Sequence, residues 1–249
     1  MKRVLLVSFA VLLVAAVALS GCAAKKQVVV VATDATWPPF ESINEQTKEF
    51  EGFDIDLMNA IAKEAGFEVK WENVPWDALL AGMGTGQYDA AISAMTILPE
   101  RAEQFNFSDP YYAAGQVIAV RIDNTDITKK EDLVGKKAGG QLGTTGVIEI
   151  EKIQGAEVKN YDSIDQAFLD LINGQIDAVV ADNPLVLAYV AKNADKLKVV
   201  GEPFTGEQYG IAVKKGNEAL VAKINTALKK LKDQGYLDQL NEKWVTSGK

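Results

Sequence analysis

The chain has 249 residues, with 34 acidic against 26 basic side chains, a formal net charge of −8 and no histidine. This acidity argues against nucleic acid as a partner, because phosphate binding needs a basic surface. Cys22 is the only cysteine, so the usual zinc sites, histidine-based triads, Cys–His nucleophiles and intrachain disulfides are excluded. We therefore expect neither a metal nor a cofactor.

The first 22 residues read as an export signal. Lys2 and Arg3 precede an apolar run, Val4 to Leu19, that is shorter than the roughly 20 residues a membrane-spanning helix needs. The sequence Leu19-Ser20-Gly21-Cys22 resembles a bacterial lipobox, in which the cysteine is diacylated. We expect residues 1–21 to be a signal peptide, 22–27 a lipidated tether, and the mature chain to lie outside the cytoplasm on the cell membrane. The alternative is an ordinary cleavable signal with a chance cysteine.

The first half of the mature chain alternates between strand and helix patterns. The β-branched run before Asp34 is typical of a buried strand, and Pro38-Pro39 blocks a helix directly after it. Apolar residues at helical spacing then end at Gly66, a common helix stop. In chain order we predict a strand at 28–33, a helix around 55–65, a strand at 67–71, a helix from about 77 and a strand at 90–94.

The same order of elements returns later. We predict a strand at 137–141, a helix opened by 143–146, a strand at 156–161, a helix capped by Ser163 and a strand at 178–181. Residues 86–92, GQYDAAI, and 174–180, GQIDAVV, have nearly the same sequence. Each half is therefore strand–helix–strand–helix–strand, which calls for a parallel sheet with right-handed crossovers. Chance similarity between two α/β turns is the alternative for the short repeat alone.

The remaining segments predict how two such lobes are joined. The strand pattern at 116–121 would carry the chain into the second lobe, and that at 209–214 would bring it back, so two strands form the hinge. We expect lobe 1 at 28–117 and 212–249, the latter with helices near 218–232 and 236–244, and lobe 2 at 118–211. Ligands of open parallel sheets bind beyond the carboxyl ends of the strands, which predicts a cleft between the lobes.

Polar residues at these strand ends are candidates for holding a ligand. Arg101 can grip a carboxylate with two parallel hydrogen bonds; alternatively it is a surface arginine paired with a nearby glutamate. Thr144 and Thr145 open a helix, where free amides favour an anion, or they are a plain N-cap. Asp182 can receive an ammonium group, or cap the helix near Pro184.

One acidic and two aromatic residues are further candidates for holding a ligand. Asp34 is the natural partner for a cationic side chain, or a turn residue ahead of the prolines. Trp37 and Trp76 could sandwich an aliphatic stem or stack on a guanidinium, or pack as core. A carboxylate clamp, an ammonium acceptor and an acidic, aromatic slot together outline a zwitterionic amino acid.

At this point the chain resembles the polar amino-acid-binding proteins of ABC importers, which have the type II periplasmic-binding fold. The resemblance covers nearly the whole mature chain. It rests on these segments in this order: 32–34 through 38–41, 52–57, 93–101, 107–112, 141–146, 181–184 and 208–211. It implies an α/β protein of two lobes, each a mostly parallel sheet flanked by helices, joined by a two-strand hinge.

The resemblance also implies roles for individual residues. The arginine matching Arg101 grips the α-carboxylate with groups matching Thr96 and Thr145, and Asp182 with the Ala94 carbonyl takes the α-ammonium. The side-chain pocket is lined at the positions of Asp34, Trp37, Trp76 and Gln141. The full set expected to bind ligand is Asp34, Trp37, Trp76, Ala94, Met95, Thr96, Arg101, Gln141, Thr144, Thr145 and Asp182.

The implied function is that of a receptor without catalytic activity. We expect a monomer that captures arginine or lysine between closing lobes and delivers it to a permease pair driven by ATPases. Glutamine is the alternative ligand, although glutamine receptors of this family carry lysine where this chain has Gln141. A dehydratase acting on cyclic acids shares the fold and is the alternative from another class, with Asp34, Glu41 or Asp182 as its acid. A sensor ectodomain is a third alternative.

Overall fold

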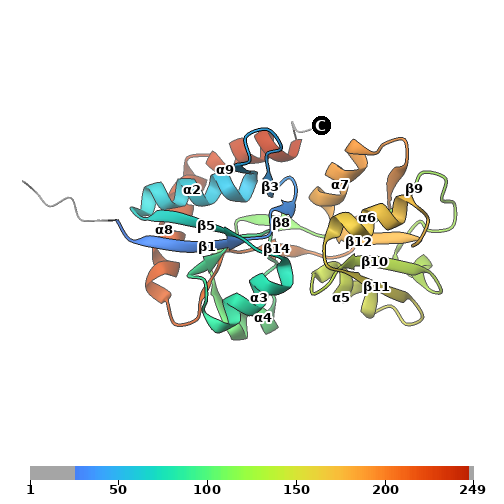
Figure 1. Cartoon of the computed structure of the whole chain (residues 1–249), viewed down its shortest axis with the longest axis horizontal. Helices are drawn as coiled ribbons and strands as arrows, with labels where there is room; N and C mark the ends of the chain where they lie inside the picture. Colours follow the sequence, from blue (N-terminus) through green and yellow to red (C-terminus); the bar gives the residue numbers. More distant parts are fainter. Residues whose placement is uncertain (1–25, 247–249) are drawn as a thin grey trace, which may run out of the picture.

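The computed structural model describes residues 26–246, which form two α/β lobes side by side (Figure 1). The predicted signal peptide, the lipidation site at Cys22 and most of the predicted tether lie outside the described residues. Within residues 26–246, no helix has both the length and the apolar composition needed to cross a bilayer.

The first lobe is built on a five-stranded sheet. Strand β1 (Val28–Thr33), the central one of its three parallel strands, runs parallel to β5 and β6, whereas β15 runs antiparallel to both β6 and β7. The order across the sheet is β5 (Glu68–Asn73), β1, β6 (Ala90–Ala91), β15 (Ala212–Lys214) and β7 (Phe105–Phe107).

The second lobe repeats this arrangement. Strand β10 (Lys137–Gln141) runs parallel to β11 and β12, and β9 runs antiparallel to both β12 and β13. The order is β11 (Glu157–Tyr161), β10, β12 (Ala178–Asp182), β9 (Gln116–Arg121) and β13 (Leu197–Val200). The predicted strand–helix–strand–helix–strand order is therefore present in both lobes, with an antiparallel pair completing each sheet.

Helices cover the sheets because each presents an apolar stripe to them. In α2 the side chains of Ile55, Met58 and Ile61 are buried, and the helix ends at Gly66, whose φ of 76° is in the left-handed region that glycine tolerates. The helices of lobe 1 are α2 (Phe53–Ala65), α3 (Trp76–Thr85), α4 (Pro99–Gln104), α8 (Glu218–Asp233), α9 (Tyr236–Leu240) and a π-helical turn (Asn241–Thr246). Lobe 2 carries a 3-10 turn (Lys130–Leu133), α5 (Thr145–Glu151), α6 (Ile164–Ile172) and α7 (Asn183–Lys192).

The short sequence repeat has the same structure in both lobes. Asp89 accepts a hydrogen bond from the Val30 amide at 2.8 Å, and Asp177 accepts one from the Lys137 amide at 2.8 Å. Each aspartate also donates its own amide to the carbonyl of the same partner. Each side chain thereby ties the turn before the third parallel strand to the central strand, so the repeat is structural rather than a chance similarity.

Two strands connect the lobes, and they differ from those that the sequence predicts. Strands β8 (Tyr112–Ala114) and β14 (Glu207–Tyr209) pair as a separate antiparallel ribbon between the two sheets (Figure 1). The predicted crossing strand at 116–121 lies instead in the sheet of lobe 2, as β9. The predicted strand at 209–214 is divided between the ribbon (β14) and the sheet of lobe 1 (β15).

Two other segments also differ from prediction. The strand predicted at 90–94 is shorter and ends at Ala91, and Ala94 has a φ of 44°, which excludes it from a strand. Ser163 occupies the N-cap position of α6 as expected, yet its side chain makes no capping hydrogen bond. A small antiparallel sheet, β2 (Thr36–Trp37), β3 (Glu41–Ile43) and β4 (Phe50–Glu51), follows β1 and brings the Pro38-Pro39 segment against α2.

Candidate ligand-binding site

A small cavity lies between the lobes, beyond the carboxyl ends of β1 and β10. This is where ligands of open α/β sheets bind. Both lobes contribute to its wall, which is formed by Asp34, Trp37, Trp76, Ser93, Ala94, Thr96, Arg101, Gln141, Thr144, Thr145 and Asp182.

The wall matches the predicted set except at one position. Met95 does not line the cavity: its side chain is 0 % exposed and packs in a core cluster with Trp76 and Leu79. Ser93, two residues earlier, lines the cavity although it is not in the predicted set. Between them Ala94 adopts a left-handed φ of 44°, a conformation that an alanine in the sequence does not signal.

Arg101 is a buried cation inside the cavity wall. Its side chain is 7 % exposed, and it makes no ion pair among the described residues, contrary to its alternative as a surface arginine. Its Nη1 donates to the Thr96 carbonyl at 2.9 Å, and Nη2 donates across the cleft to the Gly143 carbonyl at 3.0 Å. Burial lowers the pKa of Arg101 to about 10, so the guanidinium stays charged at neutral pH. The site thus holds a guanidinium that no protein carboxylate neutralises directly.

Asp182 provides a buried carboxyl group in the same wall. It accepts hydrogen bonds from Gln116 Nε2 and, at 2.5 Å, from the Tyr209 hydroxyl. Although it stands at the N-cap position of α7, its side chain makes no capping hydrogen bond. Burial, followed by the charge of Glu207, raises its pKa to about 7. A cationic group entering the cavity would stabilise the ionised form.

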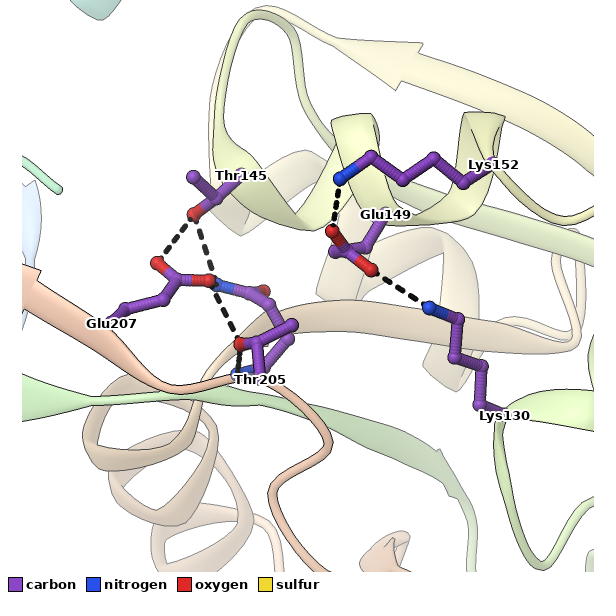
Figure 2. A network of polar contacts seen from close by, with 7 residues as sticks. Lys130, Thr145, Glu149, Lys152, Thr205 and Glu207 are labelled. Carbon is purple, nitrogen blue, oxygen red and sulfur yellow. Dashed lines mark hydrogen bonds and ion pairs between the residues drawn. The ribbon is translucent and has the colours of Figure 1, made fainter. Parts of the chain in front are cut away.

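Glu207, which the sequence analysis did not single out, ties the two lobes together behind the cavity. Its Oε2 accepts hydrogen bonds from Thr96 Oγ1 of lobe 1 at 2.6 Å and from Thr145 Oγ1 of lobe 2 at 2.9 Å. Its Oε1 accepts from Thr205 Oγ1 at 2.9 Å and from Gln116 Nε2 at 3.0 Å. Figure 2 shows this carboxylate between Thr145 and Thr205.

A separate ion-pair group lies near this network on lobe 2. Glu149 of α5 pairs with Lys130 at 2.7 Å and with Lys152 at 2.6 Å (Figure 2). Together these lysines lower the pKa of Glu149, although burial opposes the shift. The group fixes α5 to the 3-10 turn and does not line the cavity.

Asp34 forms the acidic end of the cavity. Its Oδ2 accepts a hydrogen bond from Gln141 Nε2 of lobe 2 at 2.9 Å, and its Oδ1 accepts one from Thr36 Oγ1 at 2.8 Å. Burial raises its pKa, and the hydrogen bonds from Gln141 and Thr36 oppose the shift. Asp34 is therefore a turn residue ahead of the prolines, as one of its two interpretations predicts, and it also lines the cavity wall.

The two tryptophans flank this region. Trp37 and Trp76 are buried wall residues, and neither indole Nε1 has a hydrogen-bond partner among the described residues. The Arg101 guanidinium lies 5.2 Å from the centroid of the Trp76 ring, at cation–π distance. Trp37, Trp76 and Asp34 thus line the same cavity.

The start of α5 closes the wall opposite Arg101. Thr144 is its N-cap residue, but its hydroxyl donates back to the Gln141 carbonyl at 2.7 Å instead of capping the helix. Thr145 is the first helical residue, so its amide has no acceptor within the helix. A free amide beside a guanidinium is an arrangement suited to a carboxylate.

Two facing α/β lobes, a connecting ribbon and a charged cavity between them define a two-lobed solute-binding protein of the type II periplasmic-binding fold. Residues 29–247 match the family model of bacterial extracellular solute-binding proteins, family 3, and the chain belongs to this family.

Related proteins and structures agree with this assignment. The "ABC transporter arginine-binding protein 1" of Escherichia coli K12 is 40 % identical over 217 residues, covering 84 % of this chain and 87 % of its own. An ancestral arginine-binding protein bound to arginine is 45 % identical, with a TM-score of 0.84, covering 88 % of this chain and 98 % of its own; the same values hold for its structure with glutamine. An ancestral amino acid-binding protein described as a precursor of cyclohexadienyl dehydratase is 39 % identical, with a TM-score of 0.81, covering 88 % of this chain and 95 % of its own.

Proposed function

We propose that this protein is the extracytoplasmic substrate-binding lipoprotein of an ABC importer, and that it captures a polar L-amino acid, preferentially arginine or lysine, between its lobes. One observation carries the proposal: a buried guanidinium without a carboxylate partner and a buried carboxyl group, Arg101 and Asp182, lie in the wall of one small cavity. These are the complementary charges of an amino acid's α-carboxylate and α-ammonium groups.

The proposed contacts follow from this arrangement. Arg101 binds the α-carboxylate together with the free amide of Thr145, and Thr96 lies beside them. Asp182 and the Ala94 carbonyl receive the α-ammonium. The ligand side chain then extends between Trp37 and Trp76 toward Asp34, with Gln141 and Thr144 completing the wall.

The charge of the wall favours a cationic side chain. Two carboxylates, Asp34 and Asp182, face one guanidinium, so the ionised wall carries one negative charge in excess. Arginine and lysine each bring one net positive charge and neutralise it, whereas glutamine leaves it buried and uncompensated. The arginine named for the similar transporter protein and ancestral structure supports the same preference.

Capture and delivery would proceed by closure of the lobes about the connecting ribbon. Ligand bound to both lobes stabilises the closed form, which docks on the permease and its ATPases. We propose the lobes at 28–117 with 212–249 and at 118–211, a monomeric state, and a lipid anchor at Cys22 that keeps the protein at the outer face of the cell membrane.

Each of two alternative functions is supported by a specific observation. Glutamine is the second ligand candidate, because a similar ancestral arginine-binding protein has also been obtained with glutamine. A cyclohexadienyl dehydratase-like enzyme is the candidate from another class, given the likeness to a dehydratase precursor. Of the acids that such chemistry could use, Glu41 is 0 % exposed and absent from the cavity wall, which leaves Asp34 and Asp182.

The clamp is tested by replacing its arginine. Arg101→Ala removes one member of a buried charge pair with the ligand, so arginine affinity should fall by about 3 kcal/mol or more, at least a hundredfold. Arg101→Lys should also bind poorly because an ammonium group cannot donate two parallel hydrogen bonds. Calorimetric titration measures both, with Arg121→Lys in β9 as the control. Wild-type affinity in the Arg101→Ala protein would contradict the clamp.

A further inference from the structure

Two acidic side chains lie behind the cavity wall, and the proposed function does not use them. Glu41 belongs to β3 and Asp54 to the first turn of α2, and both are 0 % exposed. Neither is among the residues that line the cavity, and neither forms an ion pair with a lysine or arginine in the described part of the chain. Buried carboxylates without a counter-ion are rare, so this pair requires an explanation.

In each of these two carboxyl groups, one oxygen accepts hydrogen bonds and the other lacks a partner among the described residues. Glu41 Oε1 accepts from Ser93 Oγ at 2.8 Å, while Asp54 Oδ2 accepts from the Ala94 amide at 2.8 Å and from the Tyr111 hydroxyl at 2.8 Å. The second oxygen of each, Glu41 Oε2 and Asp54 Oδ1, has no partner among the described residues. One proton held between the two groups would satisfy both orphaned oxygens and leave a single buried charge.

The surroundings favour such a proton. Burial and the neighbouring Asp54 raise the pKa of Glu41 well above its usual range, and burial raises the pKa of Asp54 to about 7. Of the other titratable groups facing the pair, Asp34 adds negative charge and raises the pKa of Glu41 further, and Tyr111 is a neutral donor whose own pKa is raised by burial. None of these groups supplies positive charge, and Asp54 accepts hydrogen bonds from the Ala94 amide and the Tyr111 hydroxyl, which stabilise its anion. Among the described residues Glu41 accepts only from Ser93, so Glu41 is the member that keeps the proton.

The pair holds two wall residues in place. Ala94 has a φ of 44°, a left-handed conformation that costs an alanine free energy, and its amide is fixed by Asp54. Ser93 donates to Glu41 and accepts a hydrogen bond from the Asp34 amide at 3.0 Å. Through these contacts the pair reaches both the residue proposed to take the α-ammonium and the residue proposed to face the ligand side chain.

We propose that Glu41 and Asp54 form a carboxylic acid–carboxylate pair sharing one proton, and that this pair positions Ser93, Ala94 and Asp34 for ligand binding. Its effect on binding rests on the proposed function, whereas the shared proton does not.

The chemistry predicts an asymmetry between the two residues. Glu41→Leu removes the proton donor and leaves the Asp54 charge unpaired, so arginine affinity should fall at least about tenfold. Glu41→Gln should restore affinity to within about threefold of wild type, because a neutral amide can donate to Asp54 and accept from Ser93 as the neutral acid does. Asp54→Asn should not keep arginine affinity close to that of wild type, because it removes the anion that accepts hydrogen bonds from Ala94, Tyr111 and Glu41.

Infrared difference spectra between ligand-free wild-type protein and its variants test directly whether the pair holds a proton. At about pH 8.5, where exposed carboxyl groups and Asp182 are ionised, wild type should show the carbonyl stretch of one protonated carboxylic acid, and Glu41→Gln should lack it. The control Glu49→Gln, an exposed residue two positions from Glu51, should retain it. Calorimetry with arginine and with glutamine then measures binding.

The outcomes separate the two proposals. Absence of the protonated-acid band in wild type, or its persistence in Glu41→Gln, would overturn the shared proton even if Asp54→Asn fails to fold. A band that behaves as expected, with Glu41→Gln as weak in binding as Glu41→Leu, would overturn the positioning role. A wild-type protein that binds neither amino acid would contradict the proposed function and leave the infrared test of the pair intact.

Discussion

Replacing Asp34 by asparagine should convert a receptor that prefers arginine into one that does not. Asp34 is buried, and its carboxylate already accepts hydrogen bonds from Gln141 at 2.9 Å and Thr36 at 2.8 Å. The substitution keeps the volume and one acceptor oxygen but removes the counter-charge of a cationic side chain. Leaving a buried charge without its partner costs about 2–5 kcal/mol, which is about 30-fold to a few thousandfold in affinity.

Glutamine should respond differently to the same change. Its amide carries no charge, so Asp34→Asn should alter glutamine affinity by less than about tenfold. The ratio of arginine to glutamine affinity, measured by calorimetry on ligand-stripped protein, isolates the electrostatic contribution. Asp77→Asn, an exposed acid beside Trp76, is the matched control and should leave the ratio unchanged. Unchanged arginine affinity in Asp34→Asn would refute the assignment of Asp34 as the counter-charge.

Four further predictions concern pH, the link between the lobes and the anchor. The pKa of Asp182 is raised to about 7, and its ionised form must receive the ammonium group. Arginine affinity should therefore fall as the pH drops below about 7, by a factor that approaches tenfold per pH unit. A dissociation constant that is flat between about pH 5 and 8 would contradict this. The free energy of unfolding of the empty protein should instead rise as the pH falls from about 7 to about 4, because in this range Asp182 holds a proton in the folded state that the unfolded chain releases. Glu207→Gln replaces one of two acceptor oxygens by an amide NH₂, so in either orientation of the amide two of the four donors lose their acceptor. Calorimetry should therefore show a loss of about 1.5–3 kcal/mol in arginine binding, and wild-type affinity would argue against a link between the lobes. Cys22→Ser should release the protein from the membrane fraction of cells, and continued membrane association would exclude the lipid anchor.

The strand and helix order could be predicted because it depends on local patterns. The β-branched run of β1, the helical spacing of α2 and the repeated text at 86–92 and 174–180 each predict an element that the structure contains. Strand direction is different, because it depends on the path of the whole chain. The patterns at 116–121 and 209–214 therefore predict strands where β9 and β15 occur, but not that these strands run antiparallel within the two sheets.

The hinge was misassigned for a similar reason. The apolar pattern at 209–214 is continuous in the sequence, whereas the structure divides it between the ribbon and the lobe 1 sheet. Gly210 lies at this division, where an added Cβ would come within 2.8 Å of the Ile97 side chain. Such a close approach depends on a residue more than a hundred positions away, and no local pattern reveals it.

Most of the cavity wall could be predicted because charged and aromatic residues at strand ends are conspicuous and match a known family. The exceptions depend on tertiary contacts, which no local sequence pattern reveals. Met95 is buried next to Ala94, whose left-handed conformation depends on a hydrogen bond to the distant Asp54. Glu207 resembles any other acidic residue in the sequence, and only the folded structure brings four hydrogen-bond donors to its carboxylate. The buried position of Glu207 is set by the pairing of β14 with β8.

The most direct test of the account is calorimetric titration of the refolded, ligand-stripped mature domain with each of the twenty amino acids. The account predicts tight binding of arginine or lysine, with weaker or no binding of neutral and acidic amino acids. Tight binding of glutamine in preference to both would keep the receptor and overturn the cationic pocket. Binding of no amino acid at all would contradict the central claim that Arg101 and Asp182 clamp the α-carboxylate and α-ammonium of one ligand.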